Sequence, residues 1–317
     1  MALVLGIDGG GSRLRAALAE STGGPPSATA STGAANARSV PAPVLEDRLA
    51  HAVRRVLPRE RAEEVRCVVA GFAGAGIPGR EADAGQAVAI KALHGALARH
   101  GVTGARVEVV ADTELAFAGA PGTPADGLAV IAGTGAAAAR IRDHRLSATA
   151  DGCGWLTGDD GSGFWIAREG VRRALRAADG RGPATLLVGR LAEVFGAPTL
   201  DPSVVRFALV DGALTPGDPV RLARHCPVVV RAAVDGDAVA NGVLDEAADL
   251  LEESTAALRP LRGEALVTSG GLLGPNGPLL GRFAARTAAR GLTPYPVADG
   301  LAGAVAWARR LCGGAEG

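Results

Sequence analysis

The chain has 317 residues, of which 48% are hydrophobic and 21% are charged. This composition is that of a globular protein with a large buried core, in two domains or in one large α/β domain. The 33 basic and 33 acidic residues balance, so the net charge gives no reason to expect nucleic acid or an anionic membrane as a partner.

Cysteine spacing and hydropathy bear on where the protein works. Its cysteines, Cys67, Cys153, Cys226 and Cys312, are far apart and form no CxxC pair. That spacing does not suit a zinc ion or an iron–sulfur cluster, so we expect reduced thiols. The first residues do not resemble a signal peptide, and no apolar run approaches the roughly 20 residues that span a membrane. We therefore expect a cytoplasmic protein.

The first half of the chain opens with a predicted β-hairpin. Apolar residues over 3–8 and 13–19 indicate two strands that are joined by a glycine turn. The elements predicted after it are a loop with some extended structure over 21–43, a helix over 44–57, a strand over 65–74, a helix over 85–100 and a strand that ends at Asp112.

The second half starts like the first. The stretch "GLAVIAGTGAAAARI" at 127–141 is again an apolar strand, a glycine turn and a returning apolar segment. The elements predicted after it are a mostly helical region over 162–260, the strand "EALVTSGG", a glycine turn at 270–277 and a final helix over 299–312. The repeated hairpin indicates two related lobes, each of which contributes one glycine turn to a phosphate site.

The opening turn contains more glycine than a hairpin requires. The stretch "GIDGGGS" places one carboxylate, Asp8, before three consecutive glycines. Glycines supply the positive φ of a tight turn, and a carboxylate can cap such a turn, but each glycine costs folding entropy. Bare backbone N–H groups beside an acid are suited to phosphate that is held together with a divalent cation.

Two other nucleotide-binding patterns fit less well. A P-loop requires a lysine in its G-x-x-x-x-G-K-[ST] motif, and Lys91, the single lysine of the chain, is followed by alanine. The segment "GTGAAA" matches the G-x-G-x-x-A pattern of a dinucleotide-binding fold. The residues after this segment, however, indicate a short strand and a turn rather than the long helix of that fold.

Four stretches, taken in order, carry a resemblance to a known superfamily. They are "GIDGGGSRLRAAL", "VVADTELAFAGA", "GLAVIAGTGAAAAR" and "LVTSGGLLGPNGPL". They resemble the phosphate 1, first connecting, phosphate 2 and adenosine segments of the actin, hexokinase and Hsp70 superfamily, and "VADGLAGAVAWA" resembles its second connecting segment. Within the superfamily, "GAANARSV" and "DGCGWLTGDDGSGFWIAREGVRRAL" resemble the N-acetylglucosamine kinase and BadF/BadG/BcrA/BcrD ATPase family.

The resemblance implies a two-lobed α/β fold of the ribonuclease H-like kind, with a nucleotide cleft between the lobes. It places the first lobe at residues 1–115, completed by a C-terminal helix at 299–313, and the second lobe at 116–298. It also implies ATP and Mg²⁺ as cofactors, with Asp8 holding the metal ion through water. The residues that it assigns to ATP and its phosphates are Gly9, Gly10, Gly11, Ser12, Arg13, Gly133, Thr134, Gly135, Gly270 and Gly271.

The resemblance also assigns a catalytic base. Asp112 would accept the proton of the sugar hydroxyl that attacks the γ-phosphate. Its structural alternative is the N-cap of the following helix, and Glu114 is a weaker candidate base because it should already lie on that helix. The residues that the resemblance assigns to the substrate are Asn36, Asp112, Cys153, Gly154, Trp155 and Asp159.

The substrate residues have structural alternatives as well. They are a turn for Asn36, a helix cap for Asp159 and core packing for Trp155. Asp160 stands where the family often has glutamate, so its role stays open. The loop after Asn36 has no aromatic platform for a sugar, so recognition of an acetyl group also stays open.

The predicted function is an ATP-dependent amino-sugar kinase that phosphorylates N-acetylglucosamine at its 6-hydroxyl. Glucosamine, muramic acid or a related sugar are alternative substrates, and an ATPase of the dehydratase-activator type is an alternative class that the isolated cysteines disfavour. A sugar-responsive DNA-binding regulator would need a helix-turn-helix segment, which the sequence does not show. The predicted partner is a small-molecule sugar, without nucleic acid or membrane, and with a homodimer as a further option.

Overall fold

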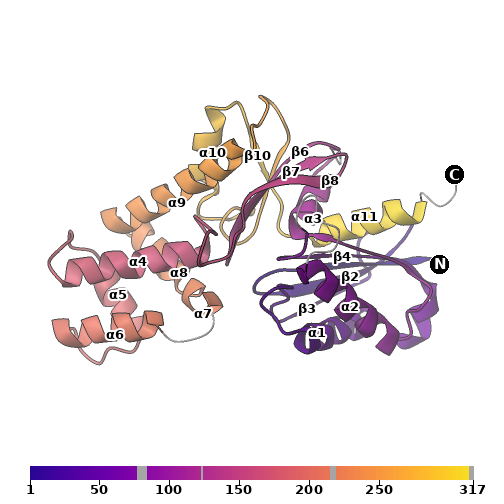
Figure 1. The fold of residues 1–317 in the computed structure, drawn as a ribbon, viewed down its shortest axis with the longest axis horizontal. Helices are drawn as coiled ribbons and strands as arrows, with labels where there is room; N and C mark the ends of the chain where they lie inside the picture. The colour runs from indigo at the N-terminus through magenta and orange to yellow at the C-terminus, as the bar shows by residue number, and fades with distance from the viewer. Residues whose placement is uncertain (77–83, 123, 215–218, 314–317) are drawn as a thin grey trace.

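A computed structural model of the chain describes residues 1–76, 84–122, 124–214 and 219–313 (Figure 1). It contains two five-stranded sheets with helices packed on their faces. The predicted α/β class is therefore confirmed. In Figure 1 the first sheet and the N-terminus lie on the right, and a purely helical region extends to the far left.

The first sheet has the strand order β3-β2-β1-β4-β5. Its strands are β1 (Leu3–Gly9), β2 (Leu14–Glu20), β3 (Ala28–Thr32), β4 (Val65–Phe72) and β5 (Arg106–Ala111). The opening hairpin is confirmed, because β1 and β2 pair in antiparallel fashion, whereas β1, β4 and β5 run parallel. Strand β3 falls inside the segment predicted as a loop with some extended structure.

Helices cover both faces of the first sheet. They are α1 (Ala42–Val56), α2 (Ala84–Arg99), α3 (Asp112–Ala118) and α11 (Leu301–Gly313), with the short 3₁₀ helix η1 (Arg59–Glu64) before β4. Side chains alternate along a strand, so Leu5 of β1 packs with α1 and α2 on one face. Its neighbour Val4 packs with Leu115 of α3 and Trp307 of α11 on the other face.

The second sheet has the order β10-β9-β6-β7-β8. Its strands are β6 (Gly127–Ala132), β7 (Ala136–Arg142), β8 (Arg145–Asp151), β9 (Leu266–Ser269) and β10 (Pro294–Pro296). The predicted second hairpin is confirmed by the antiparallel pair of β6 and β7. Phe117 of α3 packs against this sheet, whereas Leu115 of the same helix packs against the first one. Helix α3 therefore lies between the two sheets and contacts both.

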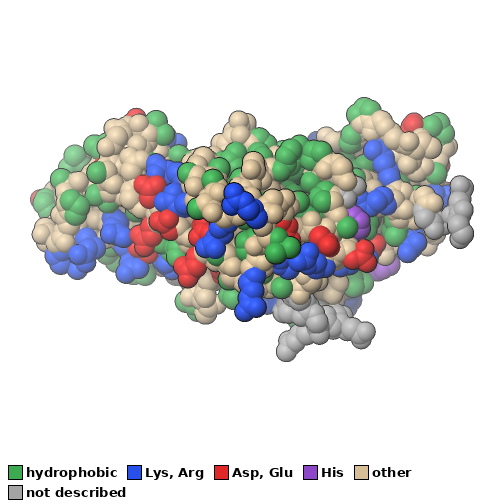
Figure 2. All heavy atoms as spheres, turned by 90° about the horizontal axis from the view of Figure 1, so that it is seen from above, with side chains coloured by type: hydrophobic (Ala, Val, Ile, Leu, Met, Phe, Trp, Pro, Cys, Tyr) green, Lys and Arg blue, Asp and Glu red, His purple; other side chains and the backbone are tan. Residues whose placement is uncertain are grey.

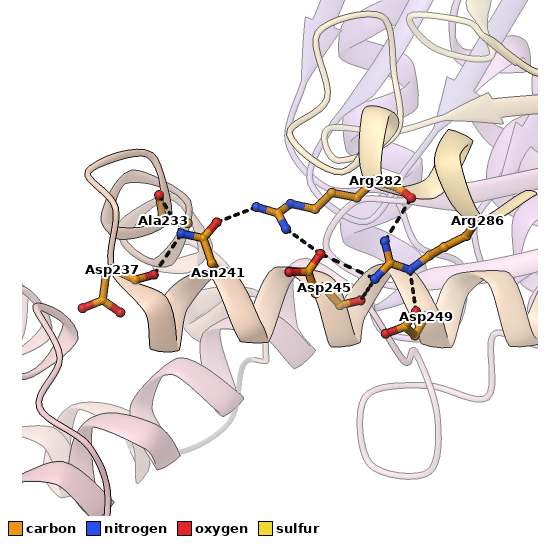
Figure 3. A network of polar contacts seen from close by, with 7 residues as sticks. All are labelled: Ala233, Asp237, Asn241, Asp245, Asp249, Arg282 and Arg286. Carbon is orange, nitrogen blue, oxygen red and sulfur yellow. Dashed lines mark hydrogen bonds and ion pairs between the residues drawn. The ribbon is translucent and has the colours of Figure 1, made fainter.

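The predicted helical region is confirmed within the described residues; residues 215–218 lie outside them. Its helices are α4 (Gly163–Ala178), α5 (Leu187–Val194), α6 (Pro202–Leu214), α7 (Pro219–Ala223), α8 (Cys226–Val234) and α9 (Ala238–Ala257), and α10 (Leu280–Ala288) follows β9. Arg282 of α10 donates to Asn241 at 2.6 Å and to Asp245 at 2.5 Å, both on α9 (Figure 3). These hydrogen bonds hold α10 against α9. They therefore also fix the position of the chain just after the glycine turn at 270–277, which precedes α10.

The surface agrees with the balanced composition. Lys and Arg side chains mingle with Asp and Glu side chains over the face seen in Figure 2, without a broad patch of one sign. Among the described helices none is both long enough and apolar enough to cross a lipid bilayer.

Candidate active site

The parallel strands of the first sheet end level with one another. In the register, Gly9 of β1 lies opposite Phe72 of β4, and Phe72 lies opposite Ala111 of β5. Asp8 is the next-to-last residue of β1, and Asp112 directly follows β5. Because β4 lies between these strands, the two carboxylates stand at one sheet edge with their backbones about 10 Å apart at ordinary strand spacing.

The first glycine turn leaves no room for side chains beside β4. A Cβ atom on Gly9 would lie 2.4 Å from the Phe72 ring, a distance that real Cβ atoms do not reach. Gly10 donates its N–H to the carbonyl oxygen of Arg13 at 2.8 Å, which closes the turn. The Arg13 side chain itself is exposed. The turn is thus bare backbone at the edge where both carboxylates stand.

Asp8 is buried, with 6% of its surface exposed. It pairs with Arg15 at 3.3 Å and accepts the N–H of Gly300 at 3.3 Å. Burial raises the pKa of Asp8 to about 6; the nearby Asp299 adds to this rise, and the guanidinium of Arg15 opposes it. Arg15 also pairs with Asp299 at 3.2 Å. Sequence reasoning assigned no role to Arg15 or Asp299, because the contact joins opposite ends of the chain.

Asp112 is the first residue of α3 rather than its cap. Ala111 holds the N-cap position, so the alternative in which Asp112 is the N-cap is wrong. Asp112 accepts the N–H of Thr113 at 2.9 Å. Burial, followed by the charge of Asp8, raises the pKa of Asp112 to about 7. A carboxylate with a raised pKa is suited to proton transfer near neutral pH.

Glu114 closes the start of α3 instead. Its carboxylate accepts the N–H of Ala111 at 2.8 Å and the N–H of Leu146, at the start of β8, at 3.1 Å. One side chain therefore ties the turn that carries Asp112 to the second sheet. Because both of its oxygens accept backbone hydrogen bonds, Glu114 is a poor candidate base, as the sequence indicated.

The loop that carries Asn36 lies beside the first glycine turn. Ala35 donates its N–H to the carbonyl oxygen of Gly10 at 3.0 Å. The Asn36 side-chain oxygen accepts the N–H groups of Arg38 at 2.9 Å and Ser39 at 3.2 Å, so the turn reading of Asn36 is confirmed. These hydrogen bonds use the side-chain oxygen of Asn36, and within the described residues its Nδ2 group has no protein acceptor.

Two glycine turns meet at the edge of the second sheet. Gly133 donates its N–H to the carbonyl oxygen of Gly135 at 2.9 Å, and Gly163 at the start of α4 donates to Gly133 at 2.7 Å. Gly270 has φ of +92°, and a Cβ atom on it would lie 2.3 Å from the carbonyl oxygen of Ala132. Only glycine fits this approach. The turns predicted for the phosphates and for adenosine are therefore direct neighbours.

Asp159 lies against the 133–135 turn. A Cβ atom on Gly135 would be 2.7 Å from its carboxylate. Burial, followed by the charge of Asp151, raises the pKa of Asp159 to about 6. The helix-cap alternative for Asp159 is wrong, because Ser162 is the N-cap of α4 and accepts the N–H of Trp165 at 3.1 Å.

Asp151 was not identified from the sequence, although it shapes this turn. It ends β8 and accepts the N–H groups of Asp159 at 2.8 Å and Asp160 at 2.7 Å. Its position as a carboxylate at a strand end, before "GCGW", is the signal that could have revealed it. Burial and the charge of Asp151 also raise the pKa of Asp160.

The remaining predicted substrate residues lie on the open side of this turn. Trp155 is 44% exposed and contacts only the edge of the Phe164 ring among aromatic side chains of the described residues, at 5.4 Å between centroids. The core-packing alternative for Trp155 is therefore wrong. Cys153 is exposed, and Gly154 has φ of +89°.

The two sheet edges face each other through their glycine turns. Ser12 Oγ and Thr134 Oγ1 are 2.6 Å apart, one on each turn. A Cβ atom on Gly11 would lie 3.6 Å from Thr134 Cβ. Two hydroxyl groups and the backbone N–H groups of both glycine turns therefore meet from opposite lobes, beside the sheet edge that carries Asp8 and Asp112.

These groups fit a nucleotide with its metal ion. Mg²⁺ prefers oxygen ligands and keeps several of its waters, so it needs few protein carboxylates. Within the described ranges no group of three or more His, Cys, Asp or Glu side chains could hold a metal by itself. Asp8 at the first turn therefore suits an ion that is shared with phosphate oxygens and water.

Two α/β lobes that bring paired glycine turns face to face define the class of actin- and hexokinase-like proteins. Residues 5–308 match the BadF/BadG/BcrA/BcrD ATPase family, and the chain belongs to this family. An N-acetylmuramic acid/N-acetylglucosamine kinase of Clostridium acetobutylicum is 30% identical over 173 residues, which are 53% of this chain and 55% of the relative. The alignment thus spans about half the length of this curated relative.

Solved structures share the fold over nearly the whole chain. A protein of Porphyromonas gingivalis, provisionally named an N-acetylglucosamine kinase, has a TM-score of 0.75 at 21% identity and covers 98% of this chain and 99% of its own. A provisionally named N-acetylglucosamine kinase of Chromobacterium violaceum has a TM-score of 0.70 at 23% identity, with 96% and 98% covered. A ROK family glucokinase of Streptomyces griseus has a TM-score of 0.59 at 18% identity, with 98% and 100% covered. The predicted two-lobed actin/hexokinase-like α/β fold is confirmed by these likenesses.

Proposed function

We propose that the chain is an ATP-dependent sugar kinase that phosphorylates N-acetylglucosamine at its 6-hydroxyl. The observation that carries this proposal is the approach of the two glycine turns through Ser12 and Thr134, 2.6 Å apart, beside the edge with Asp8 and Asp112. Phosphoryl transfer needs positioning and neutralisation of oxygen charge more than covalent help from the protein. Bare turns from two lobes supply both when they approach the phosphates from opposite sides.

In this proposal Asp112 is the catalytic base. Its raised pKa of about 7 lets its carboxylate take the proton of the attacking hydroxyl at Oδ2 while Oδ1 accepts the N–H of Thr113. The hydrogen bond to Thr113 orients the carboxylate at the end of β5. Arg15 and Gly300 hold Asp8 in the same way at the end of β1.

The nucleotide is assigned to the remaining bare backbone. The Gly9–Gly11 and Gly133–Gly135 turns would hold its phosphates, and Gly270 and Gly271 would approach its adenosine. No heavy atom lies within 4 Å of a Cβ built on Gly271, so this backbone is open to a ligand. Mg²⁺ bound near Asp8 would neutralise charge that develops on the phosphate oxygens.

The sugar is assigned to the side of the site that Asn36 and Asp159 border. The Asn36 Nδ2 donor and the Asp159 carboxylate offer complementary hydrogen bonds to hydroxyl and amide groups. The curated relative is named for both N-acetylmuramic acid and N-acetylglucosamine, so N-acetylmuramic acid is the second candidate substrate. We also propose that residues 1–115 with the helix 299–313 form one lobe and residues 116–298 the other.

A sugar panel tests the proposal. The purified chain would be assayed with Mg²⁺ and ATP against N-acetylglucosamine, N-acetylmuramic acid, glucosamine and glucose, with kcat/KM determined for each. We expect N-acetylglucosamine to give the highest value and the product to carry phosphate at C6. Equal ATP hydrolysis with every sugar and with none would refute the kinase proposal and favour the ATPase class.

A further inference from the structure

A cavity of about 470 Å³ lies where residues of β5, β8 and α11 meet, at the junction of the two lobes. It is lined by Arg106 and Glu108 of β5, Arg145 of β8, and Trp307 and Arg310 of α11. Figure 1 shows β8 and α11 near each other where the two sheets approach. The strand residues of this lining stand near the starts of β5 and β8, and its α11 residues stand in the second half of that helix, whereas the candidate active site lies at the ends of both strands. The cavity is therefore separate from that site.

The charges that line the cavity do not balance. Arg145 pairs with Glu108. Arg106 and Arg310, in contrast, have no carboxylate within ion-pair distance in the part of the chain that the structure describes. Three guanidinium groups and one carboxylate leave two positive charges, and the groups come from three different elements.

Trp307 holds two of these guanidinium groups in place. The Arg145 guanidinium lies 4.8 Å from the centre of the Trp307 ring, and the Arg310 guanidinium lies 5.7 Å from it. The ring is buried, with 6% of the residue exposed, so it is a fixed platform. Cation–π contacts of this kind restrict the arginines before any ligand arrives, which lowers the entropy that binding would cost.

We propose that this cavity binds the phosphate group of a small phosphorylated metabolite. A phosphate monoester is close to a dianion at neutral pH, which matches the two unbalanced charges. Guanidinium groups bind phosphate oxygens through two parallel N–H donors, and the volume admits a phosphate together with a small organic group. Because Arg145 belongs to the second sheet and Arg106 and Arg310 to the first lobe, the bound phosphate joins the two lobes.

Calorimetric titration of the full chain with glycerol 3-phosphate at pH 8 tests this inference. The experiment omits ATP, sugar and Mg²⁺, so its outcome does not depend on the proposed kinase activity. Inorganic phosphate is a second probe and neutral glycerol is the negative probe. We expect both phosphates to bind and glycerol not to bind. Tighter binding of glycerol 3-phosphate identifies an ester as the ligand, whereas equal binding supports the same site with free phosphate as its ligand.

Variants locate the binding at this cavity. The double variant Arg106→Gln and Arg310→Gln should weaken glycerol 3-phosphate at least tenfold, and Glu108→Gln should strengthen it severalfold because it removes the competing carboxylate. The matched control is Arg59→Gln, an exposed arginine of η1, which should change nothing. Absence of binding by the wild type up to 10 mM of either probe, or unchanged affinity in the double variant, would overturn the proposal. Melting curves of each variant verify that the fold is retained.

Discussion

Replacement of Asp112 by asparagine separates catalysis from structure at the candidate base. Asparagine keeps the size of the side chain and its acceptor for the N–H of Thr113, which lies 2.9 Å from the carboxylate. It cannot take the proton of an attacking hydroxyl. Turnover should therefore fall by roughly 10² to 10⁴, the usual contribution of general acid–base catalysis. The affinities for ATP and sugar should change much less, because the glycine turns and Asn36 are untouched.

The same substitution has an effect on stability that can be worked out from the pKa. Burial raises the pKa of Asp112 from 3.8 to about 7 in the folded chain. Between these two values the folded state binds more protons than the unfolded state, so stability falls as the pH rises through this range. The full shift corresponds to about 4 kcal/mol, and solvent contact at the half-buried side chain reduces this to about 1–2 kcal/mol.

Asp112→Asn removes this cost of ionisation. At pH 8, without Mg²⁺ or nucleotide, the variant should therefore melt a few degrees above the wild type, at about 2–4 °C per kcal/mol for a chain of this order of size. At pH 4 the two proteins should melt alike, because the wild-type carboxyl is then mostly protonated.

The assay measures kcat, both ligand affinities and Tm on one preparation of each protein. Asp235→Asn is the matched control, because it makes the same chemical change at an exposed carboxylate that pairs with Arg190. Its kcat should match that of the wild type. A near-normal kcat in Asp112→Asn would show that this residue does not take part in the proton transfer. If the difference in Tm between the variant and the wild type were the same at pH 4 and at pH 8, the account of its buried charge would be refuted.

Three further substitutions address other parts of the site. Asp8→Asn should raise the Mg²⁺ concentration that half-saturates the reaction by at least tenfold while the chain stays folded, and unchanged Mg²⁺ dependence would exclude Asp8 from the metal site. Asn36→Asp keeps the acceptor that closes its turn but loses the Nδ2 donor. The KM for sugar should therefore rise about 5- to 150-fold, equivalent to about 1–3 kcal/mol, while the KM for ATP changes little. A parallel rise of both KM values would indicate a displaced loop instead. Gly9→Ala places a Cβ atom 2.4 Å from the Phe72 ring. The substitution should therefore lower the free energy of unfolding, measured by denaturant titration, by about 1–3 kcal/mol. An unchanged free energy of unfolding would contradict the tight approach of β1 to this ring.

Periodicity and turn chemistry were sufficient to predict most elements of both lobes. The hairpins over 3–19 and 127–141 formed as expected because each has a nearly continuous apolar run on both sides of a glycine turn. Strand β8 was not predicted because its stretch "RLSATAD" is half polar and lies at a sheet edge, where burial supplies little pattern. The short strand β10 also lies at a sheet edge, and it begins and ends with proline. Because proline has no N–H to donate to a neighbouring strand, its sequence does not indicate a strand.

The candidate site was predictable where a residue ends a strand, and less so where distant segments meet. Asp8 and Asp112 could be located because each stands at the C-terminal end of an apolar strand. The contact between Ser12 and Thr134 joins residues 122 positions apart, and local sequence does not encode such a distance. Likewise, the exposure of Trp155 depends on how α4 packs beneath it, which its apolar character alone could not reveal.

Direct identification of the product tests the central claim. The purified chain would be incubated with ATP, Mg²⁺ and N-acetylglucosamine, and the mixture followed by phosphorus and carbon NMR. The account predicts one phosphorylated sugar per ADP formed, with the phosphate on the oxygen of C6, and loss of this product in Asp112→Asn. ADP and inorganic phosphate without any phosphorylated sugar would contradict it.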